Sequence, residues 1–352
     1  TYEIQENQGL LPLSLLNVQG EMDKLLEEPP EGNLVEETLD FYFQVRDFLN
    51  ISELVDENYT IYTENGEDGK FRLHLSCVNP AMNLKEYLDK GKSTVFFSAT
   101  LLPMQYYRKL LSTRSDDFGI YVESPFSREK RLILTCADVS SRYKRRDYPE
   151  YKKIAEYIAR TVWKRPGNYM AFFPSYRLMQ EVRQVYEEEF SVDWVRSISQ
   201  VPEMHERERE EFLKEFSKNE GTLVGFCVLG GVFSEGIDLS GEKLIGAFIV
   251  GTGLPQIGSR REILREYYDK RGENGFDHAY RYPGMNKVLQ AAGRVIRTAE
   301  DVGVILLMDE RFLNREYQSL FPVEWEDRTA CRLQTVEDKL ADFWRKNNCA
   351  KL

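Results

Sequence analysis

Between residues 131 and 308, short continuous apolar runs alternate with segments of helical period, and this pattern constrains the fold more than any other feature. Continuous apolar runs indicate strands buried on both faces, since a strand with one face in water alternates apolar and polar residues. Strands that alternate with helices become parallel neighbours, so the sequence predicts an α/β fold with a parallel sheet covered by helices on both faces. The predicted strands are Leu132–Thr135, Tyr169–Phe173, Val192–Val195, Leu223–Leu229, Leu244–Gly251 and Val302–Met308, and the predicted helices are Tyr151–Lys164, Tyr176–Phe190, Glu203–Ser217, Ile257–Lys270 and Met285–Arg297.

The first third of the chain has a different pattern. Leu34–Val55 places apolar residues at helical spacing, and Phe71–Val78 alternates apolar and polar residues as a half-buried strand does. The turn-rich joint Ser124-Pro125-Phe126-Ser127 precedes a basic stretch. We therefore predict two domains, residues 1–125 and 126–352. The other elements predicted in the first domain are the strand Tyr59–Thr63, the short buried strand Thr94–Phe97, and the helices Pro80–Lys90 and Leu102–Leu111.

Charge is divided unevenly along the 352 residues, whose net charge is −11. Residues 1–70 hold 17 of the 58 acidic side chains and 3 of the 47 basic ones, so residues 71–352 hold 41 acidic and 44 basic side chains. Seven basic and two acidic residues lie within Arg128–Arg146. The acidity belongs to the N-terminal segment, and the remainder is suited to binding a polyanion.

Cysteine spacing and hydropathy exclude several classes of protein. No apolar run approaches the roughly 20 residues that a membrane-spanning helix needs. The cysteines lie far apart without a CxxC pair, which favours reduced thiols in a cytoplasmic protein. The same spacing argues against a disulfide framework and against a zinc or iron–sulfur site within this chain. The five are Cys77, Cys136, Cys227, Cys331 and Cys349.

The segment QAAGRVIR, residues 290–297, has the composition of an anion-binding site. On a helix, Gln290, Arg294 and Arg297 would share one stripe. Gly293 within that stripe would let a large ligand approach. Arginine suits phosphate because its planar guanidinium is always charged and binds two oxygens at once. The alternative is a surface helix whose arginines pair with nearby carboxylates.

The loop after Tyr169–Phe173 carries Ser175, Tyr176 and Arg177. Ligands of parallel sheets bind at the carboxyl ends of strands, which is where this loop lies. Ser175 is placed to cap the next helix, and a helix N-terminus offers free N–H groups to a phosphate. Simple capping without a ligand is the alternative.

Two further loops follow predicted strands. The first, Gly230–Asp238, contains three glycines, so its backbone can approach a ligand closely. There Ser234 could donate to a phosphate, and Asp238 could orient an arginine or a metal-bound water; an ordinary turn is the alternative. The second, Ser98-Ala99-Thr100, offers two hydroxyls, although Ser and Thr are also common helix caps.

Taken in order, SAT, FFPSY, SEGID and QAAGRVIR resemble motifs III, IV, V and VI of superfamily 2 DNA helicases of the XPD/DinG type. The SAT and QAAGRVIR forms are similar to those of bacterial DinG-like proteins. The resemblance covers most of residues 71–325. It implies a RecA-like motor domain 2 at residues 126–352. Residues 1–125 would be the C-terminal remainder of motor domain 1, with the end of an Arch-like insertion at about 1–33.

The resemblance also implies roles for individual residues in an ATP-dependent helicase that moves 5′ to 3′ on single-stranded DNA. An arginine finger stabilises the transferring phosphoryl group. The implied catalytic residues are Arg294, Arg297 and Gln290; the implied nucleotide-binding residues are Gly236, Asp238 and Gly293; the implied DNA-binding residues are Ser175, Tyr176, Arg177, Ser234, Ser98 and Thr100.

The sequence contains no GxxxxGK[ST] phosphate loop, no DEAH-like box and none of the family's four cluster cysteines. In the family these features lie in motor domain 1, so the chain is expected to be the C-terminal half of a longer helicase. ATP and Mg²⁺ would then be shared with the N-terminal motor domain, any iron–sulfur cluster would lie in that half, and the chain alone would be inactive. Two alternatives remain: a non-catalytic module that binds nucleic acid or protein, and an RNA helicase.

Overall fold

The computed structural model describes residues 2–27, 34–66, 68–218, 220–233 and 239–347. They form two compact units. The helix that follows residue 257 belongs to the first unit, whereas the sequence pattern assigns it to the second domain. Unit 1 comprises Thr1–Phe97, Met104–Gly119 and Ile257–Gly275, and unit 2 comprises Ser98–Pro103, Ile120–Gln256 and Phe276–Leu352.

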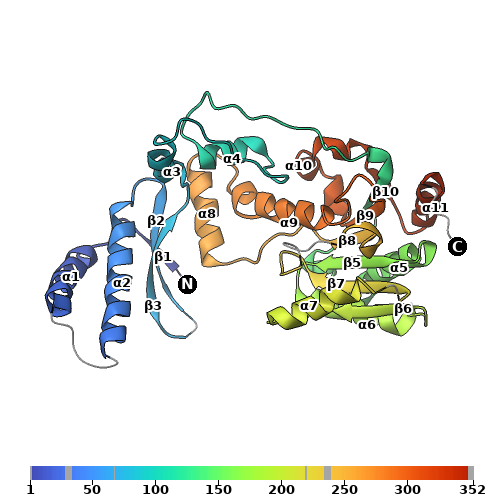
Figure 1. Ribbon diagram of the computed structural model, residues 1–352, viewed down its shortest axis with the longest axis horizontal. Helices are drawn as coiled ribbons and strands as arrows, with labels where there is room; N and C mark the ends of the chain where they lie inside the picture. Colours follow the sequence, from blue (N-terminus) through green and yellow to red (C-terminus); the bar gives the residue numbers. More distant parts are fainter. Residues whose placement is uncertain (1, 28–33, 67, 219, 234–238, 348–352) are drawn as a thin grey trace. The chain divides into compact units, whose positions relative to one another are not determined.

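Unit 2 is built on a seven-stranded sheet in the order β10-β4-β9-β8-β5-β7-β6. Figure 1 labels these strands except β4. Every pairing in it is parallel. The predicted parallel sheet is therefore confirmed. Its strands are β4 (Arg131–Cys136), β5 (Asn168–Phe173), β6 (Val195–Ser199), β7 (Thr222–Val228), β8 (Gly246–Val250), β9 (Gly303–Met308) and β10 (Thr329–Cys331).

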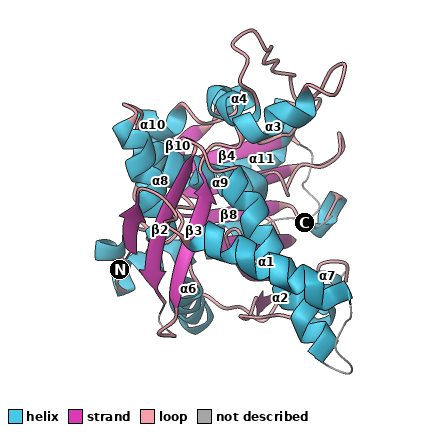
Figure 2. Cartoon of the chain, turned by 90° about the vertical axis from the view of Figure 1, so that its left-hand side faces the viewer, coloured by secondary structure: helices cyan, strands magenta, loops and turns pink. Residues whose placement is uncertain are grey.

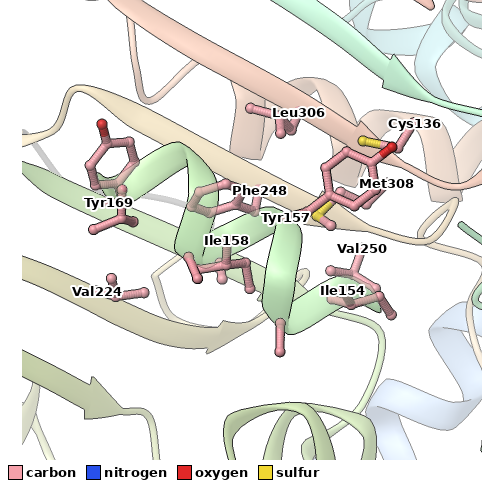
Figure 3. Close-up of a cluster of buried hydrophobic side chains, with 14 of the residues drawn as sticks. Cys136, Ile154, Tyr157, Ile158, Tyr169, Val224, Phe248, Val250, Leu306 and Met308 are labelled. Atoms are coloured by element: carbon pink, nitrogen blue, oxygen red, sulfur yellow. The ribbon is translucent and has the colours of Figure 1, made fainter. Parts of the chain in front are cut away.

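Helices cover both faces of this sheet because its strands are apolar on both faces. In β5, Tyr169 and Phe173 pack into one core, and Phe172 packs into the core on the opposite face. Figure 3 shows part of the first core, where Tyr157 and Ile158 meet strand side chains such as Phe248. Burial of one such side chain contributes about 1.5–3 kcal/mol. The first core includes α5 (Tyr148–Lys164), α6 (Tyr176–Glu189) and α11 (Val336–Lys346), and the second includes α7 (Glu206–Glu215), α9 (Tyr282–Ala292) and α10 (Arg315–Gln318).

Unit 1 contains a three-stranded antiparallel sheet in the order β1-β2-β3. Figure 2 shows β2 and β3 side by side. The strands β2 and β3 and the helix α2 were predicted, whereas β1 and α1 were not. The elements are β1 (Tyr2–Gln5), α1 (Leu11–Glu27), α2 (Leu34–Glu53), β2 (Tyr59–Asn65), β3 (Phe71–Cys77), α3 (Ala81–Leu88), α4 (Met104–Leu111) and α8 (Ser259–Lys270).

Three predicted elements were wrong in place or kind. Thr94–Phe97 is not a strand, and the Phe97 side chain is 90% exposed. An apolar run becomes a buried strand only between strand neighbours, and within the described part of the chain these residues pair with none. The strand predicted at Val192–Val195 begins at Val195 and runs to Ser199. The helix predicted to reach Arg297 ends at Ala292.

Candidate functional site

The arginines of QAAGRVIR lie beyond the end of α9 rather than on a helical stripe. Gly293 is the C-terminal cap, and the N–H groups of Arg294 and Val295 turn back to the carbonyls of Ala291 and Ala292 at 3.2 and 3.3 Å. Gly293 is exposed, whereas Arg294 and Arg297 are half-buried. The prediction that Gln290, Arg294 and Arg297 share one helical face is therefore wrong, because the helix ends between the first and the second. All three still lie within eight residues of chain.

Asp301 holds the segment that carries Arg297, called the arginine loop below (residues 293–301). Asp301 Oδ2 accepts the N–H groups of Arg297 and Thr298, each at 2.7 Å, and its Oδ1 accepts the Gly241 N–H at 2.9 Å. The carboxylate is only 4% exposed. Burial raises the pKa of Asp301, but the N–H donors outweigh it and leave that pKa below its usual value. Asp301 thus takes the N–H groups of Arg297 and Thr298, which a longer helix would bond to its own carbonyls.

The arginine loop packs at the amino edge of the sheet, beside the starts of β8 and β9. A methyl group at Gly303, the first residue of β9, would collide with the Val295 side chain and lie 2.8 Å from the Ile245 carbonyl oxygen. Val295 itself is buried in the second core. Close packing therefore fixes this loop against the residue that precedes β8.

The segment from Gly230 to Gly241 contains the glycine-rich loop, and its two ends lie against α9 and the arginine loop. At one end, a methyl group at Gly230 would lie 2.7 Å from Lys287 Cδ of α9. At the other end, Gly241 donates its N–H to Asp301. The predicted residues Ser234, Gly236 and Asp238 lie between these ends, outside the described residues.

Three of the residues predicted to grip DNA, Ser175, Tyr176 and Arg177, follow β5 at the opposite, carboxyl edge of the sheet. Ser175 follows β5 and caps α6, its hydroxyl accepting the Leu178 N–H at 3.3 Å. Tyr176 OH accepts a hydrogen bond from Gln200 Nε2 at 2.8 Å and donates to the Val201 carbonyl at 3.4 Å. The Arg177 side chain is exposed. Ser175 and Tyr176 are therefore already engaged within the protein, and Arg177 presents its charge to solvent.

Gln200 is a residue of this edge that sequence reasoning missed. It is buried after β6, and its Oε1 accepts the Val228 N–H at 3.0 Å while its Nε2 donates to Tyr176. The amide thereby connects the ends of β6 and β7 to the loop after β5. A single glutamine at a strand end makes no pattern in sequence, and only its position at a carboxyl end could have identified it.

The basic stretch after β4 also reaches the carboxyl edge. Ser141 lies beside the loops after β8 and β5, because a methyl group at Gly251 would be 2.5 Å from Ser141 Oγ and 3.7 Å from Pro174. Arg146 donates through Nε to the Ser141 carbonyl at 3.1 Å, with its guanidinium 5.7 Å from the centre of the exposed Tyr143 ring. Three loops therefore meet here.

Charges at this junction differ in how far they are neutralised. Arg145 contacts Glu150 at 3.1 Å and Glu310 at 3.5 Å. For Arg146, burial first, and then the like charges of Arg311 and Arg177, lower the pKa of the guanidinium. A group of cations that repel one another in this way favours an anionic ligand.

Asp309 and Arg311 form a buried ion pair beneath the same edge. Asp309 is fully buried after β9; its Oδ1 accepts from Arg311 Nε at 2.8 Å and its Oδ2 from Ser141 Oγ at 2.7 Å. Burial raises the pKa of Asp309, but the bonds from Arg311 and Ser141 outweigh it and leave that pKa low. The pair therefore anchors the loop after β4 to the end of β9.

Ser98 and Thr100 form a short hydroxyl turn. The Thr100 N–H donates to Ser98 Oγ at 3.1 Å, and the two hydroxyl oxygens lie 3.3 Å apart. Nearby, Leu102 packs against the second core of unit 2. The segment is thus attached to unit 2, although it lies far from motif IV in sequence.

Within residues 2–27, 34–66, 68–218, 220–233 and 239–347, no group of three or more His, Cys, Asp or Glu is placed to hold a metal ion. Over the same ranges, every helix is too short or too polar to cross a bilayer.

Comparison with known sequences gives one family and a consistent set of relatives. A family model described as the helicase C-terminal domain matches residues 158–328. The regulator of telomere elongation helicase 1 homolog of Anopheles gambiae is 25% identical over 309 residues, which cover 78% of this chain and 30% of that protein. The ATP-dependent DNA helicase XPD of Sulfolobus acidocaldarius is 26% identical over 250 residues, which cover 69% of this chain and 42% of that protein. The chain thus spans less than half the length of these relatives.

Solved structures agree with the fold. An XPD helicase superposes with a TM-score of 0.58 at 17% identity, covering 94% of this chain and 58% of that one. The Xpd4 protein of S. tokodaii superposes with a TM-score of 0.55 at 16% identity, covering 94% and 61%. The predicted α/β fold of the helicase type is therefore confirmed.

Proposed function

Since this chain carries a helicase C-terminal domain whose relatives are XPD-type superfamily 2 DNA helicases, we propose that it supplies motor domain 2 of an ATP-driven enzyme that moves on single-stranded DNA. The observation that carries the proposal is the arginine loop. Two arginines lie there in a short segment whose backbone Asp301 holds next to the turn at Gly241. Two guanidiniums in so short a segment suit a phosphate, because each can bind two of its oxygens at once.

In the proposed cycle, ATP binds between this domain and a motor domain 1 whose phosphate loop lies outside this chain. Arg294 and Arg297 stabilise charge on the transferring phosphoryl group, and Gln290 positions that group or the attacking water. Gly236, Asp238 and Gly293 form the adjacent wall. The phosphate loop, the DEAH-like box and the Mg²⁺ they hold belong to motor domain 1.

At the carboxyl edge, the proposed ligand is the phosphodiester backbone of single-stranded DNA. Arg177 is exposed beside the α6 N-terminus, a position that favours phosphate. To the residues predicted from the sequence, Ser175, Tyr176, Arg177, Ser234, Ser98 and Thr100, we add Arg146 as a cation and the exposed Tyr143 ring as a platform for a base. Travel from 5′ to 3′ is proposed from family resemblance alone.

Turnover tests the proposed substrate. ATP hydrolysis by the complete protein is expected to rise when single-stranded DNA is added, and to rise much less with RNA of the same sequence. Equal or greater stimulation by RNA would replace the DNA proposal by an RNA helicase. Absence of hydrolysis with either polymer would favour the non-catalytic module.

Replacing Arg177 and Tyr143 separately should distinguish charge from stacking. Arg177→Ala is expected to weaken binding to a labelled oligo-dT and to make the slope of log affinity against log salt shallower by about 0.7, since one phosphate contact is lost. Tyr143→Ala is expected to cost about 1–3 kcal/mol of binding with the slope unchanged. Fluorescence anisotropy at several salt concentrations measures both effects.

Tyr143→Phe is the matched control, because it keeps the ring and removes only the hydroxyl. Its affinity is expected to equal that of the wild type. Loss of binding in Tyr143→Phe would contradict stacking, and an unchanged salt slope in Arg177→Ala would contradict a phosphate contact.

The 352-residue chain by itself is expected to hydrolyse no ATP, with or without DNA. It lacks a phosphate loop, and phosphoryl transfer needs both the loop and the arginine side of the site. Release of inorganic phosphate from ATP by the purified chain is the measurement, with the complete protein as the positive control. DNA-stimulated hydrolysis by the chain alone would refute the shared site.

A further inference from the structure

Asp301 is placed to act on the nucleotide site through the backbone of its neighbours. It lies four residues after Arg297, and its carboxylate accepts N–H groups from two segments that are far apart in sequence. One segment is the arginine loop, and the other is the turn at Gly241 that precedes β8. Besides these backbone N–H groups, the Thr298 side chain also lowers the pKa of Asp301 through a hydrogen bond.

The geometry of each partner makes the connection specific. Gly241 has φ +69, a left-handed conformation that favours glycine. The hydrogen bond from its N–H to Asp301 therefore depends on a backbone conformation that most other residues adopt only with strain. Arg297 and Thr298 share a single carboxylate oxygen at 2.7 Å. A change in the position of the arginine loop or of the turn at Gly241 must therefore lengthen a hydrogen bond to the buried Asp301 carboxylate.

We propose that Asp301 is a positioning residue that fixes the Arg297 backbone against the turn at Gly241, so that Arg297 meets the phosphate in the correct geometry. The proposal rests on the proposed function, because it assigns Asp301 a role in ATP hydrolysis. Asp301 touches neither the nucleotide nor the reacting atoms. Its effect passes through Arg297, and a displacement of about 1 Å at a catalytic group lowers rates by as much as about 100-fold.

The test is a double-mutant cycle in the complete protein. Asp301→Asn keeps the shape but places an NH₂ group against an N–H donor on one side. It is expected to lower kcat for ATP hydrolysis by about 10- to 100-fold, with KM for ATP changed by less than about threefold, because ground-state binding is retained. In an Arg297→Ala background, Asp301→Asn is expected to have no further effect on kcat, because the side chain through which Asp301 acts is already absent.

Asp138→Asn is the matched control. Asp138 also accepts a backbone N–H, from Leu333 at 3.2 Å, but it lies where β4 and β10 end. Its variant is expected to leave kcat unchanged in either background. Multiplication of the Asp301→Asn and Arg297→Ala effects would overturn the positioning role, and so would a wild-type kcat in Asp301→Asn.

A second variant covers the case in which Asp301→Asn does not fold. Gly241→Ala strains the partner backbone while the buried carboxylate stays. It is expected to lower kcat by a smaller factor that also disappears in Arg297→Ala, and a persistent factor there would overturn the proposal. Amide hydrogen exchange in the 352-residue chain tests the hydrogen-bonded connection separately from the proposed function. Asp301→Asn should speed exchange at Arg297 and Thr298 even if the complete wild-type protein has no ATPase activity. In that event the proposed function fails, while the hydrogen-bonded connection stands.

Discussion

Alanine at Arg294 is expected to reduce kcat for ATP hydrolysis by the complete protein by about 10³-fold or more, the range that an arginine finger contributes. Arg294 immediately follows the glycine that ends α9, so the short turn after Gly293 fixes its backbone. Single-stranded DNA affinity in the absence of nucleotide should remain at the wild-type value, because Ser175, Tyr176 and Arg177, which are proposed to bind DNA, lie at the other edge of the sheet. Steady-state phosphate release and anisotropy measure the two quantities.

Arg297→Ala tests the second candidate in the same assays, and the larger of the two losses identifies the finger. Arg207→Ala is the control, since Arg207 is an exposed arginine of α7 paired with Glu211 at 3.1 Å. Its kcat should equal that of the wild type. Wild-type turnover in both Arg294→Ala and Arg297→Ala would contradict the assignment of motif VI as the catalytic segment.

Asp309→Ala is expected to lower the free energy of unfolding of unit 2 by about 3–5 kcal/mol, because it leaves the Arg311 charge partly buried without its carboxylate. All four tryptophans, Trp163, Trp194, Trp325 and Trp344, belong to unit 2. Tryptophan fluorescence during urea denaturation therefore reports this unit. Asp342→Ala is the control: its exposed pair with Arg345 at 3.5 Å is expected to contribute less than about 1 kcal/mol.

The Asp309 effect should depend on pH in a defined direction. The folded state holds the pKa of Asp309 below its unfolded value of about 3.9, so the stabilisation is fully present above that value and is lost as pH falls through the folded pKa. The difference in unfolding free energy between wild type and Asp309→Ala should be constant near neutral pH and shrink below about pH 4. A difference that grows as the pH falls would contradict the low pKa.

Sequence predicted the sheet of unit 2 well because its strands are buried on both faces. Runs such as Tyr169–Phe173 and Val302–Met308 have no polar interruption, and a helix separates each from the next. The edge strand β10, with three residues, carries too few positions for a pattern. The helix α1 was missed because residues 1–33 offer turn signals at Gly9, Pro12 and Gly20, whereas the structure places the last two inside the helix.

The candidate site was predicted as residues but not as geometry. Helical spacing put Arg294 and Arg297 on one stripe, but a carboxylate that sequence reasoning passed over, Asp301, takes up the backbone N–H groups that would continue the helix. The competition between a local acceptor and the helical carbonyls depends on where Asp301 lies in three dimensions. Gln200 was missed for the same reason, since its two partners, Tyr176 in α6 and Val228 in β7, lie far from it in sequence.

The exposed segment Thr94–Phe97 has a consequence for handling the protein. Val95 and Phe97 are β-branched and aromatic residues with high strand propensity, and both are exposed. Short segments of this kind, without charge or proline, template pairing with another chain when no strand covers them. We expect the 352-residue chain to self-associate at high concentration. The substitution Val95→Lys should raise the protein concentration at which light scattering first appears, because it places a charge within the exposed segment Thr94–Phe97.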